Sequence, residues 1–418
     1  MEYGCIGEHL PHSFSREIHE KLGGYGYALC EVRPGALGGF LMRADFRAIN
    51  VTIPYKERVM PYLARISDTA RAVGAVNTIV NRDGVLEGYN TDYEGMRALA
   101  ARCGIDFRGK NVTILGTGGT SKTALAVVRD AGANSVVRVS RTGREGAIGY
   151  DALPARAAVT DILINTTPVG MYPDPFPSPV SLAPFVRLSG VLDAVYNPLR
   201  TTLVLEARAR GIPAAGGLYM LAAQAAAASE LFTGEAYPAD TYERVWRAVQ
   251  AEKENIVLIG MPSAGKTTVG AALARRLGRR FIDTDAETAR RVGMAVPDFI
   301  RTRGIDAFRE AEAQTVRAVA PECGAVIAVG GGTILREENV TALRHNGRLL
   351  WLRRSLSLLH PSADRPLSDS KEKLRELEAE RTPLFRAAAD GIIDGDAGIE
   401  ETAEAAVRLW ESGTLLCP

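Results

Sequence analysis

Residues 260–267 read GMPSAGKT, a complete G-x-x-x-x-G-K-[ST] loop between an apolar run and a helical pattern rich in alanine and leucine. The glycines let successive backbone N–H groups face one anion, and the helix N-terminus adds its dipole. Lys266 is expected to reach the terminal phosphates, and the hydroxyl of Thr267 to hold Mg²⁺. The motif therefore predicts ATP binding, with these residues at the nucleotide: Gly260, Gly265, Lys266, Thr267 and Thr268.

Polar residues further along the chain suggest a second ligand site beside this loop. Asp283 and Asp285 stand at the end of the apolar run 281–283, and open α/β sheets bind ligands at the carboxyl ends of their strands. One carboxylate would serve Mg²⁺ and the other a substrate hydroxyl. Arg309 adds a guanidinium, and residues 330–332 are three glycines on which a ligand can lie against bare backbone. Nucleotide binding alone leaves a switch, a motor or a kinase open, but this set favours a small polyhydroxylated acid as phosphoryl acceptor.

Three short segments in the first quarter of the chain gather amides, hydroxyls, one ammonium and one carboxylate. They are residues 50–57, 74–78 and 88–92, and the charged pair is Lys56 and Asp92. Such a set suits a polyhydroxylated ring. Reduction of a ketone needs hydride on one face and a proton on the developing alkoxide, and this pair can supply the proton. Taken alone, the pair fits a structural ion pair equally well.

A glycine turn follows the apolar run 112–115 and opens a helical pattern, as at the first turn of a dinucleotide-binding unit. Residues 116–122 read GTGGTSK, which is shorter than the usual G-x-G-x-x-G. After the next run, 135–140, an NAD enzyme would carry an acid for the ribose hydroxyl, but here Arg141 follows, with Arg144 near it. A guanidinium pairs with a 2′-phosphate, so the sequence favours NADP(H) over NAD. The glycines expected at the cofactor are Gly116, Gly118 and Gly119.

Short apolar runs alternate with helix-like segments throughout, which is the pattern of parallel sheets covered by helices on both faces. The expected fold class is therefore α/β. The expected strands form two series, the first at residues 112–115, 135–140, 162–165 and 191–193, the second at 256–259, 281–283, 325–329 and 349–352. Between the series, Asp240 can cap a helix, with Glu243 three residues later as in a capping box. We place the domain boundary near residue 250.

Composition argues against several classes of protein. The 418 residues suffice for two or three domains, and 46% apolar with 24% charged residues is typical of globular chains. A net charge of +1 gives no field for nucleic acid or anionic lipid. The first residues do not read as a signal peptide, the most apolar helix (residues 218–231) is too short to cross a bilayer, and the five cysteines form no C-x-x-C pair. We expect a cytoplasmic protein that binds small molecules rather than nucleic acid or a membrane.

From about residue 255 onward the chain resembles shikimate kinase. The resemblance rests on the ordered series of the phosphate loop, the two aspartates, Arg309, the triple glycine, RPL at 365–367 and RTPLFR at 381–386. It implies a P-loop domain with a parallel sheet, Asp283 near Mg²⁺ with Thr267, and Arg365 in a lid over ATP. Residues 360–364, HPSAD, replace the glycine- and arginine-rich stretch expected in that lid. The residues implied at shikimate are Asp285, Arg309, Gly330, Gly331, Gly332 and Arg381.

Residues 3 to 235 resemble shikimate dehydrogenase. The resemblance rests on the segments already named and on HSFS at 12–15, NTTPVGM at 165–171, DAVYNP at 193–198 and GLYML at 217–221. It implies that Lys56 is catalytic, that Asp92 binds a ring hydroxyl beside it, and that two serines hold the substrate carboxylate with help from a tyrosine. The other residues implied at the substrate are Ser13, Ser15, Asn50, Thr52, Asn77, Tyr196 and Gln224. Those implied at NADP(H), besides the three glycines and Arg141, are Thr142, Met171 and Gly217.

The two resemblances imply a division of the chain. The expected parts are a dehydrogenase-like region at 1–240 (substrate part about 1–94 plus 218–240, Rossmann NADP-binding part about 95–217), a helical linker at 241–254 and a kinase-like P-loop domain at 255–418. Arg16, Glu20 and Ser140 stand where the dehydrogenase family usually has proline, asparagine and asparagine. None of the three departures removes a proposed catalytic group.

The product of the implied reductase is the substrate of the implied kinase. The sequence therefore predicts a bifunctional enzyme of aromatic biosynthesis that reduces 3-dehydroshikimate with NADPH and then phosphorylates shikimate with ATP and Mg²⁺. One alternative is an oxidase of quinate or shikimate fused to a kinase for another small acid such as gluconate. Another is a nucleotide-sensing module that regulates the dehydrogenase. The sequence leaves a monomer and a homodimer open.

Overall fold

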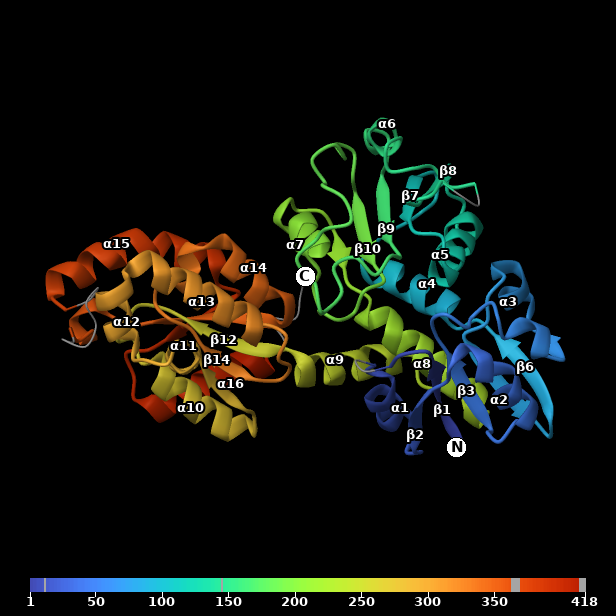
Figure 1. Cartoon of the computed structure of the whole chain (residues 1–418), viewed down its shortest axis with the longest axis horizontal. Coiled ribbons are helices and arrows are strands. Elements are labelled where there is room, and N and C mark those ends of the chain that lie inside the picture. Colours follow the sequence, from blue (N-terminus) through green and yellow to red (C-terminus); the bar gives the residue numbers. More distant parts are fainter. Residues whose placement is uncertain (11–12, 144–145, 362–368, 413–418) are drawn as a thin grey trace. The chain divides into compact units, whose positions relative to one another are not determined.

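The computed structural model describes residues 1–10, 13–143, 146–361 and 369–412. His12, Arg144, Arg365 and residues 362–364, which the sequence analysis singled out, lie outside the described residues. The chain divides into two compact units, Met1–Gln250 and Ala251–Pro418 (Figure 1). Both units combine helices with sheets rich in parallel strands, so the α/β class is confirmed.

The first unit begins with a six-stranded sheet. Its strands are β1 (Tyr3–Gly7), β2 (Tyr27–Glu31), β3 (Ala48–Val51), β4 (Arg65–Ile66), β5 (Thr78–Arg82) and β6 (Val85–Tyr89). They lie in the order β2-β1-β3-β5-β6-β4, with β2, β1 and β3 parallel and β5 antiparallel to both of its neighbours. Ile6, Ile49 and Ile79 are fully buried in one cluster, so this sheet carries the core of the region.

The antiparallel pair β5–β6 departs from the pattern expected from the sequence. Asp83 and Gly84 alone join the two strands, and both have positive φ, 51° and 91°. Positive φ at both central positions defines the type I′ turn of hairpins, for which Asp-Gly is a favoured pair. A two-residue connection is too short for the crossover that parallel strands need. The expectation of parallel sheets throughout is therefore wrong for this sheet.

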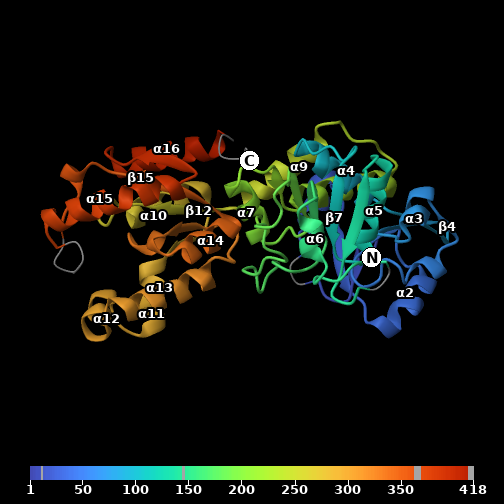
Figure 2. The ribbon, with the colours of Figure 1, turned by 90° about the horizontal axis from the view of Figure 1, so that it is seen from above.

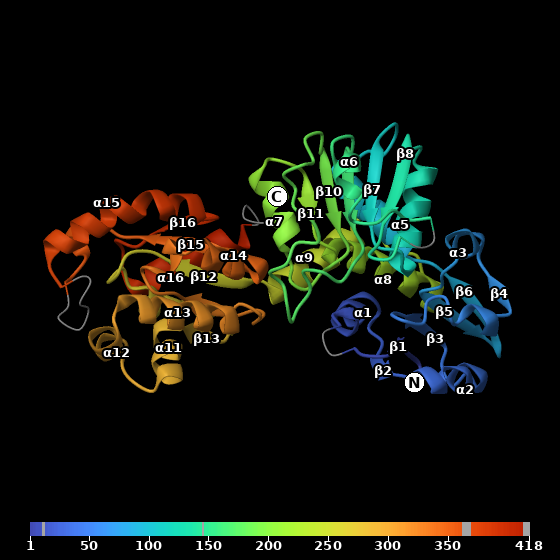
Figure 3. The same cartoon turned by 45° about the horizontal axis from the view of Figure 1, so that its top comes forward.

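A second sheet in the same unit is parallel throughout. Its strands are β7 (Asn111–Leu115), β8 (Ser135–Val139), β9 (Ile162–Asn165), β10 (Gly190–Asp193) and β11 (Ala214–Ala215). They lie in the order β11-β10-β9-β7-β8, and Figure 3 shows the sheet from β11 to β8. The first four strands coincide, within one residue at each end, with the first predicted series. The strand order reverses at β7, and open α/β sheets bind ligands beside such a point.

Helices cover both sheets of the first unit. They are α1 (Ser15–Gly23), α2 (Leu37–Arg43), α3 (Asp68–Val73), α4 (Asp92–Arg102), α5 (Gly119–Asp130), α6 (Leu153–Ala157), α7 (Thr202–Ala209), α8 (Leu218–Thr233) and α9 (Thr241–Lys253). Figure 2 shows α5 beside β7. Although α8 follows the second sheet in sequence, it packs against α1 and α4 and brings Phe232 onto the ring of Tyr3. The two ends of the unit thereby share one core.

The helix α9 begins directly after Asp240, where the sequence predicts a helix start. Its apolar face is buried in the first unit, where one cluster contains Val245, Trp246, Val249, Phe14, Ile18 and Leu218. The carboxylate of Glu243 pairs with Arg102 at 3.1 Å and with Arg247 at 2.8 Å. Most of the stretch expected as a linker is therefore packed as part of the first unit.

The second unit is built on one parallel sheet. Its strands are β12 (Asn255–Ile259), β13 (Phe281–Asp283), β14 (Val326–Ala328), β15 (Gly347–Arg353) and β16 (Gly391–Asp394). They lie in the order β13-β14-β12-β15-β16, which reverses at β12. The first four are the second predicted series, and β16 was not predicted. The loop that follows β12 therefore stands at the switch point of the sheet, where ligands are expected.

Helices lie on both faces of this sheet. They are α10 (Lys266–Leu277), α11 (Thr284–Val292), α12 (Val296–Arg303), α13 (Ile305–Val319), α14 (Glu337–Asn346), α15 (Lys371–Ala388) and α16 (Ile399–Glu411). Figure 1 shows α10 and α16 on one side of the strands, with α13 and α14 on the other. Among the helices of the described residues, none has the length and apolar composition that crossing a membrane requires.

Candidate active sites

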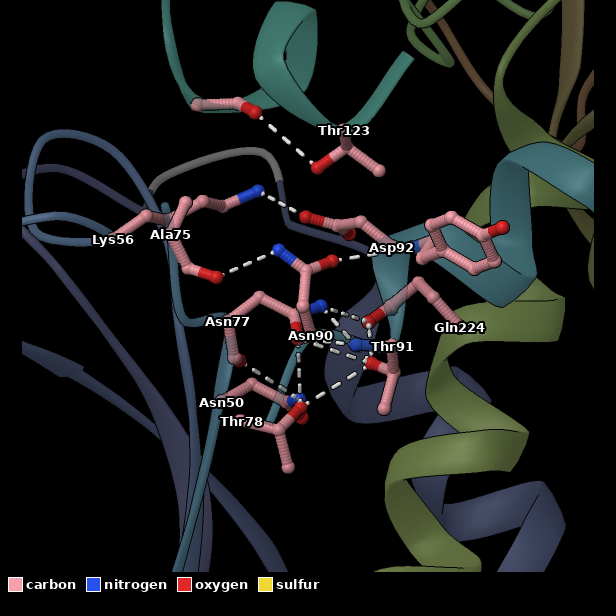
Figure 4. Close-up of polar contacts among 12 residues, drawn as sticks. Asn50, Lys56, Ala75, Asn77, Thr78, Asn90, Thr91, Asp92, Thr123 and Gln224 are labelled. Atoms are coloured by element: carbon pink, nitrogen blue, oxygen red, sulfur yellow. Dashed lines mark hydrogen bonds and ion pairs between the residues drawn. The ribbon is translucent and has the colours of Figure 1, made fainter. Parts of the chain in front are cut away.

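The ammonium of Lys56 and the carboxylate of Asp92 form an ion pair in the first unit (Figure 4). Lys56 stands in the loop after β3 and Asp92 is the first residue of α4, so folding joins two separate segments. The Nζ–Oδ2 distance is 2.6 Å, and the side chains of Lys56 and Asp92 are 14% and 9% exposed. A pair that is shielded but still open on one side can exchange a proton with a bound ligand.

Amide and hydroxyl groups gather next to this pair, as Figure 4 shows. Asn77 Nδ2 donates to Thr91 Oγ1 at 3.0 Å and to Gln224 Oε1 at 3.3 Å. Asn50 Nδ2 donates to Thr78 Oγ1 at 3.1 Å. These groups come from β3, β5, the start of α4 and α8, and together they form one buried network. The structure thus brings three of the predicted substrate residues close to the charged pair.

Two serines at the start of α1 lie beside Tyr196. The hydroxyl of Ser13 accepts the N–H of Ser15 at 3.3 Å, and Ser13 lies close enough to Tyr196 to lower the pKa of its hydroxyl. The ring of Tyr196 packs against that of Phe14, with centroids 5.3 Å apart. Burial raises the pKa of Tyr196 to about 12, so its hydroxyl keeps its proton at neutral pH. Three neighbouring hydroxyls can hold a carboxylate through hydrogen bonds.

The glycine turn after β7 approaches Lys56. A Cβ built on Gly119, the first residue of α5, would lie 3.3 Å from Lys56 Cδ. Gly116 has a φ of 111°, and a Cβ there would lie 2.7 Å from Thr166 Oγ1, so both conformation and space require glycine. The start of α5, where the first N–H groups have no partner within the helix, therefore lies beside the side chain of Lys56. A phosphate bound at this turn and a ring bound at Lys56 would be neighbours.

In the second unit, the loop after β12 encloses its own lysine. Lys266 Nζ donates to two backbone carbonyl oxygens of the loop at 2.8 and 2.9 Å. Thr267 Oγ1 donates to Asp283 Oδ2 at 2.7 Å, while Asp283 Oδ1 accepts the N–H of Asp285 at 2.9 Å and caps α11. Asp283 is therefore both a helix cap and the neighbour of the hydroxyl expected at Mg²⁺.

A cavity of about 600 Å³ opens beside this loop. A Cβ on Gly332 would lie 2.1 Å from Arg309 Nη2, so this guanidinium rests directly on bare backbone. Arg381 Nη1 donates to the carbonyl oxygen of Gly331 at 3.0 Å, and its Nε is buried with no hydrogen-bond partner among the described residues. Burial lowers the pKa of Arg381. All residues predicted for the phosphoryl acceptor line this cavity: Asp285, Arg309, Gly330, Gly331, Gly332 and Arg381.

Glu312, which the sequence analysis did not single out, holds one arginine of this cavity. Glu312 Oε2 accepts from Arg309 Nη1 at 2.7 Å, and Glu312 Oε1 accepts from Thr333 Oγ1 at 2.7 Å. The Glu312 side chain is 1% exposed and that of Arg309 12%. The signal that could have found it is the spacing of three residues on a helix, at which an acid and a base meet. Arg309 therefore keeps only its other N–H groups for a ligand.

Asp193, at the end of β10, is a second acid that the sequence analysis gave no role. Its carboxylate accepts from Asn165 Nδ2 at 2.9 Å, from the N–H of Val195 at 2.9 Å and from Thr201 Oγ1 at 2.7 Å. Burial raises the pKa of Asp193 to about 7, although these three hydrogen bonds lower it. Because Tyr196 directly follows Val195, Asp193 anchors the loop that carries Tyr196.

Known families match both halves of the chain. The family described as "Shikimate dehydrogenase substrate binding domain" matches residues 5–79, and "Shikimate kinase" matches residues 262–410. The shikimate dehydrogenase (NADP(+)) of Moorella thermoacetica is 35% identical over 288 residues, covering 62% of this chain and 96% of the relative. The chain belongs to the shikimate dehydrogenase family. The shikimate dehydrogenase of Geobacillus kaustophilus is 39% identical over 255 residues, covering 56% of this chain and 92% of its own length.

Solved structures align with the dehydrogenase part. Shikimate dehydrogenase 1 of Peptoclostridium difficile has a TM-score of 0.56 and 34% identity, and the match covers 60% of this chain and 98% of that one. The Thermus thermophilus enzyme, solved in complex with NADP(H) and shikimate, has a TM-score of 0.54 and 31% identity, and the match covers 59% of this chain and 99% of that one. The chain is therefore an NADP-dependent shikimate dehydrogenase followed by a shikimate kinase domain that uses ATP. It is both an oxidoreductase and a phosphotransferase, which confirms the two families predicted from the sequence.

The remaining residues expected at the cofactor of the dehydrogenase are less enclosed. Arg141 and Thr142 follow β8 and are exposed, and Met171 is 44% exposed. Gly217 precedes α8, and a Cβ there would lie 2.3 Å from the carbonyl oxygen of Ala194, so the position requires glycine for space. Thr52 lies in the loop after β3, half-buried. Their contacts with NADP(H) or substrate stay predictions.

We expect Asp193→Asn to change how the stability of the dehydrogenase depends on pH. In the folded state the pKa is raised from 3.8 to about 7, so the folded protein holds this proton more tightly than the unfolded chain does. Stability is then lost as pH rises from about 4 to about 7, and stays lower above that. Between pH 5 and pH 7 the free energy of unfolding should fall by about 2 kcal/mol more in the wild type than in Asp193→Asn.

The measurement is urea unfolding at several pH values in a full-length background with Trp351→Phe and Trp410→Phe. Trp246 then reports on the first unit alone, because it is the remaining tryptophan of the chain. Parallel pH curves for the two proteins would show that Asp193 is ionised throughout this range and does not titrate with folding.

Proposed function

We propose that the chain carries out two consecutive reactions, reduction of 3-dehydroshikimate to shikimate with NADPH and phosphorylation of shikimate with ATP. For the first reaction, the main support is the Lys56–Asp92 pair at 2.6 Å beside the glycine turn at Gly119. For the second, the support is one cavity that joins the phosphate loop to Asp285, Arg309 and Arg381.

In the reduction, Lys56 would stand at the ketone oxygen. NADPH, when bound, supplies the hydride. The ammonium stabilises the negative charge that develops on the oxygen and donates a proton to it, while Asp92 holds the ammonium in place. Ser13, Ser15 and Tyr196 would bind the substrate carboxylate. The ring hydroxyls would meet the polar network and its neighbours: Asn50, Thr52, Asn77, Asp92 and Gln224.

The turn and strand end of the second sheet fit NADP(H). Gly116, Gly118 and Gly119 leave the N–H groups at the start of α5 open to the pyrophosphate. Ser140 Oγ is buried and has no hydrogen-bond partner among the described residues, and Arg141 follows it directly. The hydroxyl of Ser140 and the exposed guanidinium of Arg141 are suitable donors to the 2′-phosphate that distinguishes NADP from NAD. Thr142, Met171 and Gly217 would border the cofactor.

In the phosphoryl transfer, Lys266 would leave the loop carbonyls for the phosphates of ATP. Thr267 and Asp283 offer hydroxyl and carboxylate oxygens to Mg²⁺, which usually takes one or two protein ligands and completes its shell with phosphate and water. No group of three or more His, Cys, Asp or Glu that could hold a metal is found within the described residues. Asp285 would orient the attacking hydroxyl, and Arg309 with Arg381 would bind the carboxylate.

The deciding experiment is a coupled assay on the purified full chain. With 3-dehydroshikimate, NADPH, ATP and Mg²⁺ present, shikimate 3-phosphate should accumulate. Without NADPH no product should form, without ATP the reaction should stop at shikimate, and EDTA should remove only the second step. If the chain preferred quinate with NAD to 3-dehydroshikimate with NADPH, the proposed reduction would be overturned.

A nucleotide sensor is the competing proposal for the second unit, and it differs in needing no acceptor site. The three acceptor residues Asp285, Arg309 and Arg381 line the same cavity as the phosphate loop, which favours a kinase. If the wild type released no ADP with shikimate while Lys266→Ala altered the reductase kinetics, the sensor would be the better account.

Gly332→Ala is expected to impair acceptor binding without harming the fold. The added methyl would lie 2.1 Å from the end of the Arg309 side chain, which must move, whereas the backbone φ of −108° suits alanine. The KM for shikimate should rise about tenfold, because a hydrogen bond to a charged group contributes about 1.5–3 kcal/mol. The KM for ATP in the same steady-state assay is the control. Equal increases in both would indicate a general distortion of the domain.

We also propose that both reactions take place in the cytoplasm and that neither nucleic acid nor a membrane is a partner. The proposal rests on the net charge of +1 and on the small, soluble substrates of the two reactions.

A further inference from the structure

Arg354 lies against the phosphate loop of the second unit. It is the first residue after β15, and β15 is the direct neighbour of β12 in the sheet. A Cβ built on Gly265 would lie 3.4 Å from Arg354 Nη1. Gly265 is the N-cap of α10 and directly precedes Lys266. The guanidinium is therefore next to the turn that would hold the phosphates.

This guanidinium is not fully hydrogen-bonded within the described residues. Its Nε is buried and makes no hydrogen bond there. The nearby acid Asp396 interacts with Arg354 electrostatically, but its hydrogen bonds are with Ser355, whose N–H it accepts at 2.7 Å and whose hydroxyl it also accepts. Buried polar groups are almost always hydrogen-bonded, and each exception needs a reason. A partly buried cation that faces an anion-binding turn has such a reason, namely a ligand.

Positive charge is sparse between Arg354 and Arg365. Residues 355–364 read SLSLLHPSAD and contain neither lysine nor arginine. The phosphates of MgATP carry net negative charge, and Lys266 supplies one positive charge from the loop. Arg354 is the cation that the structure adds beside that loop.

We propose that Arg354 is a nucleotide-binding residue of the kinase, which contacts the polyphosphate chain of ATP and ADP. It supplies, from the end of β15, positive charge beside the phosphate loop in addition to that of Lys266. The inference rests on the proposed kinase function and adds a residue to it. Arginine suits this place because its fork of N–H donors can bind two phosphate oxygens at once.

The test is calorimetric binding to the full chain, with MgADP and with inorganic tripolyphosphate as two separate probes. Arg354→Ala should raise the Kd of MgADP about tenfold and that of tripolyphosphate by a similar factor, as expected for a lost charge-assisted hydrogen bond. Arg354→Gln, which keeps most of the side-chain bulk, should behave like the alanine variant. Arg353→Ala is the matched control, because Arg353 carries the same charge one residue earlier and is exposed. It should leave both constants within about twofold of the wild type.

Two results would overturn the inference while the kinase proposal stands. One is that Arg354→Ala and Arg353→Ala bind MgADP and tripolyphosphate with equal Kd values. The other is weaker MgADP binding with unchanged tripolyphosphate binding, which would mean a contact with the base. Failure of the wild type to bind MgADP would instead overturn the kinase proposal, and this inference with it.

Discussion

Replacing Lys56 with alanine should lower the kcat of ketone reduction about 10³-fold, within the range known for loss of a general acid. The ammonium lies 2.6 Å from Asp92 Oδ2, and the side chain that carries it packs beside Gly119 of the glycine turn. The measurement is the loss of NADPH absorbance at saturating concentrations of both substrates. The Kd of NADPH should change far less than kcat, because Lys56 acts on the reacting oxygen. Phosphorylation of shikimate by the same protein should be unchanged.

Lys110→Ala is the matched control for this experiment. Lys110 precedes β7, at the opposite end of the strand from the glycine turn, and is half-buried. It should retain wild-type kcat. Asp92→Asn should lower kcat less than Lys56→Ala, because the ammonium stays but loses its anchor. If Lys56→Ala kept its kcat and lost only thermal stability, the pair would be a structural ion pair and not catalytic.

Features encoded within a short stretch of sequence could be predicted. The phosphate loop at residues 260–267 combines its donors, lysine and hydroxyl in eight consecutive positions, so no distant contact is needed to recognise it. The central strands β7 and β12 of the two parallel sheets are buried almost throughout, and their apolar runs identify them. Lys56 and Asp92 are separated by 36 residues. Residue types alone suggested them as a pair, but only the family resemblance favoured a catalytic pair over a structural ion pair.

Features that depend on distant partners were missed. The first sheet contains Gly4, Asn50 and Asn81 within its strands, which interrupt the apolar pattern, although Asp83-Gly84 was a readable hairpin signal. Asp193 is recognisable as special only once Asn165 and Thr201 close around it in three dimensions. Burial of a carboxylate is a property of the packed fold, and sequence reports it poorly.

Glu312→Ala is expected to be the most damaging single substitution in the kinase domain. It leaves Arg309 without its ion pair in a position only 12% exposed and leaves the hydroxyl of Thr333 without its acceptor. Removing one member of a buried pair costs about 3–5 kcal/mol, mostly because the other charge stays buried. The free energy of unfolding of the kinase domain should fall by about 3 kcal/mol. The KM for shikimate should rise at least about tenfold as Arg309 loses its position.

Glu310→Ala is the matched control, two residues earlier on the same helix α13. Its carboxylate is 55% exposed and pairs with Arg336 at 3.1 Å, so water replaces the lost contact and the cost should stay below about 1 kcal/mol. Glu312→Gln should fall between the two, since its amide oxygen can still accept from Thr333. Urea unfolding of the full chain, monitored by the loss of kinase activity, distinguishes the three variants. The dehydrogenase activity should survive in all of them. If Glu312→Ala and Glu310→Ala had equal effects, Glu312 would not be what holds Arg309 in the cavity.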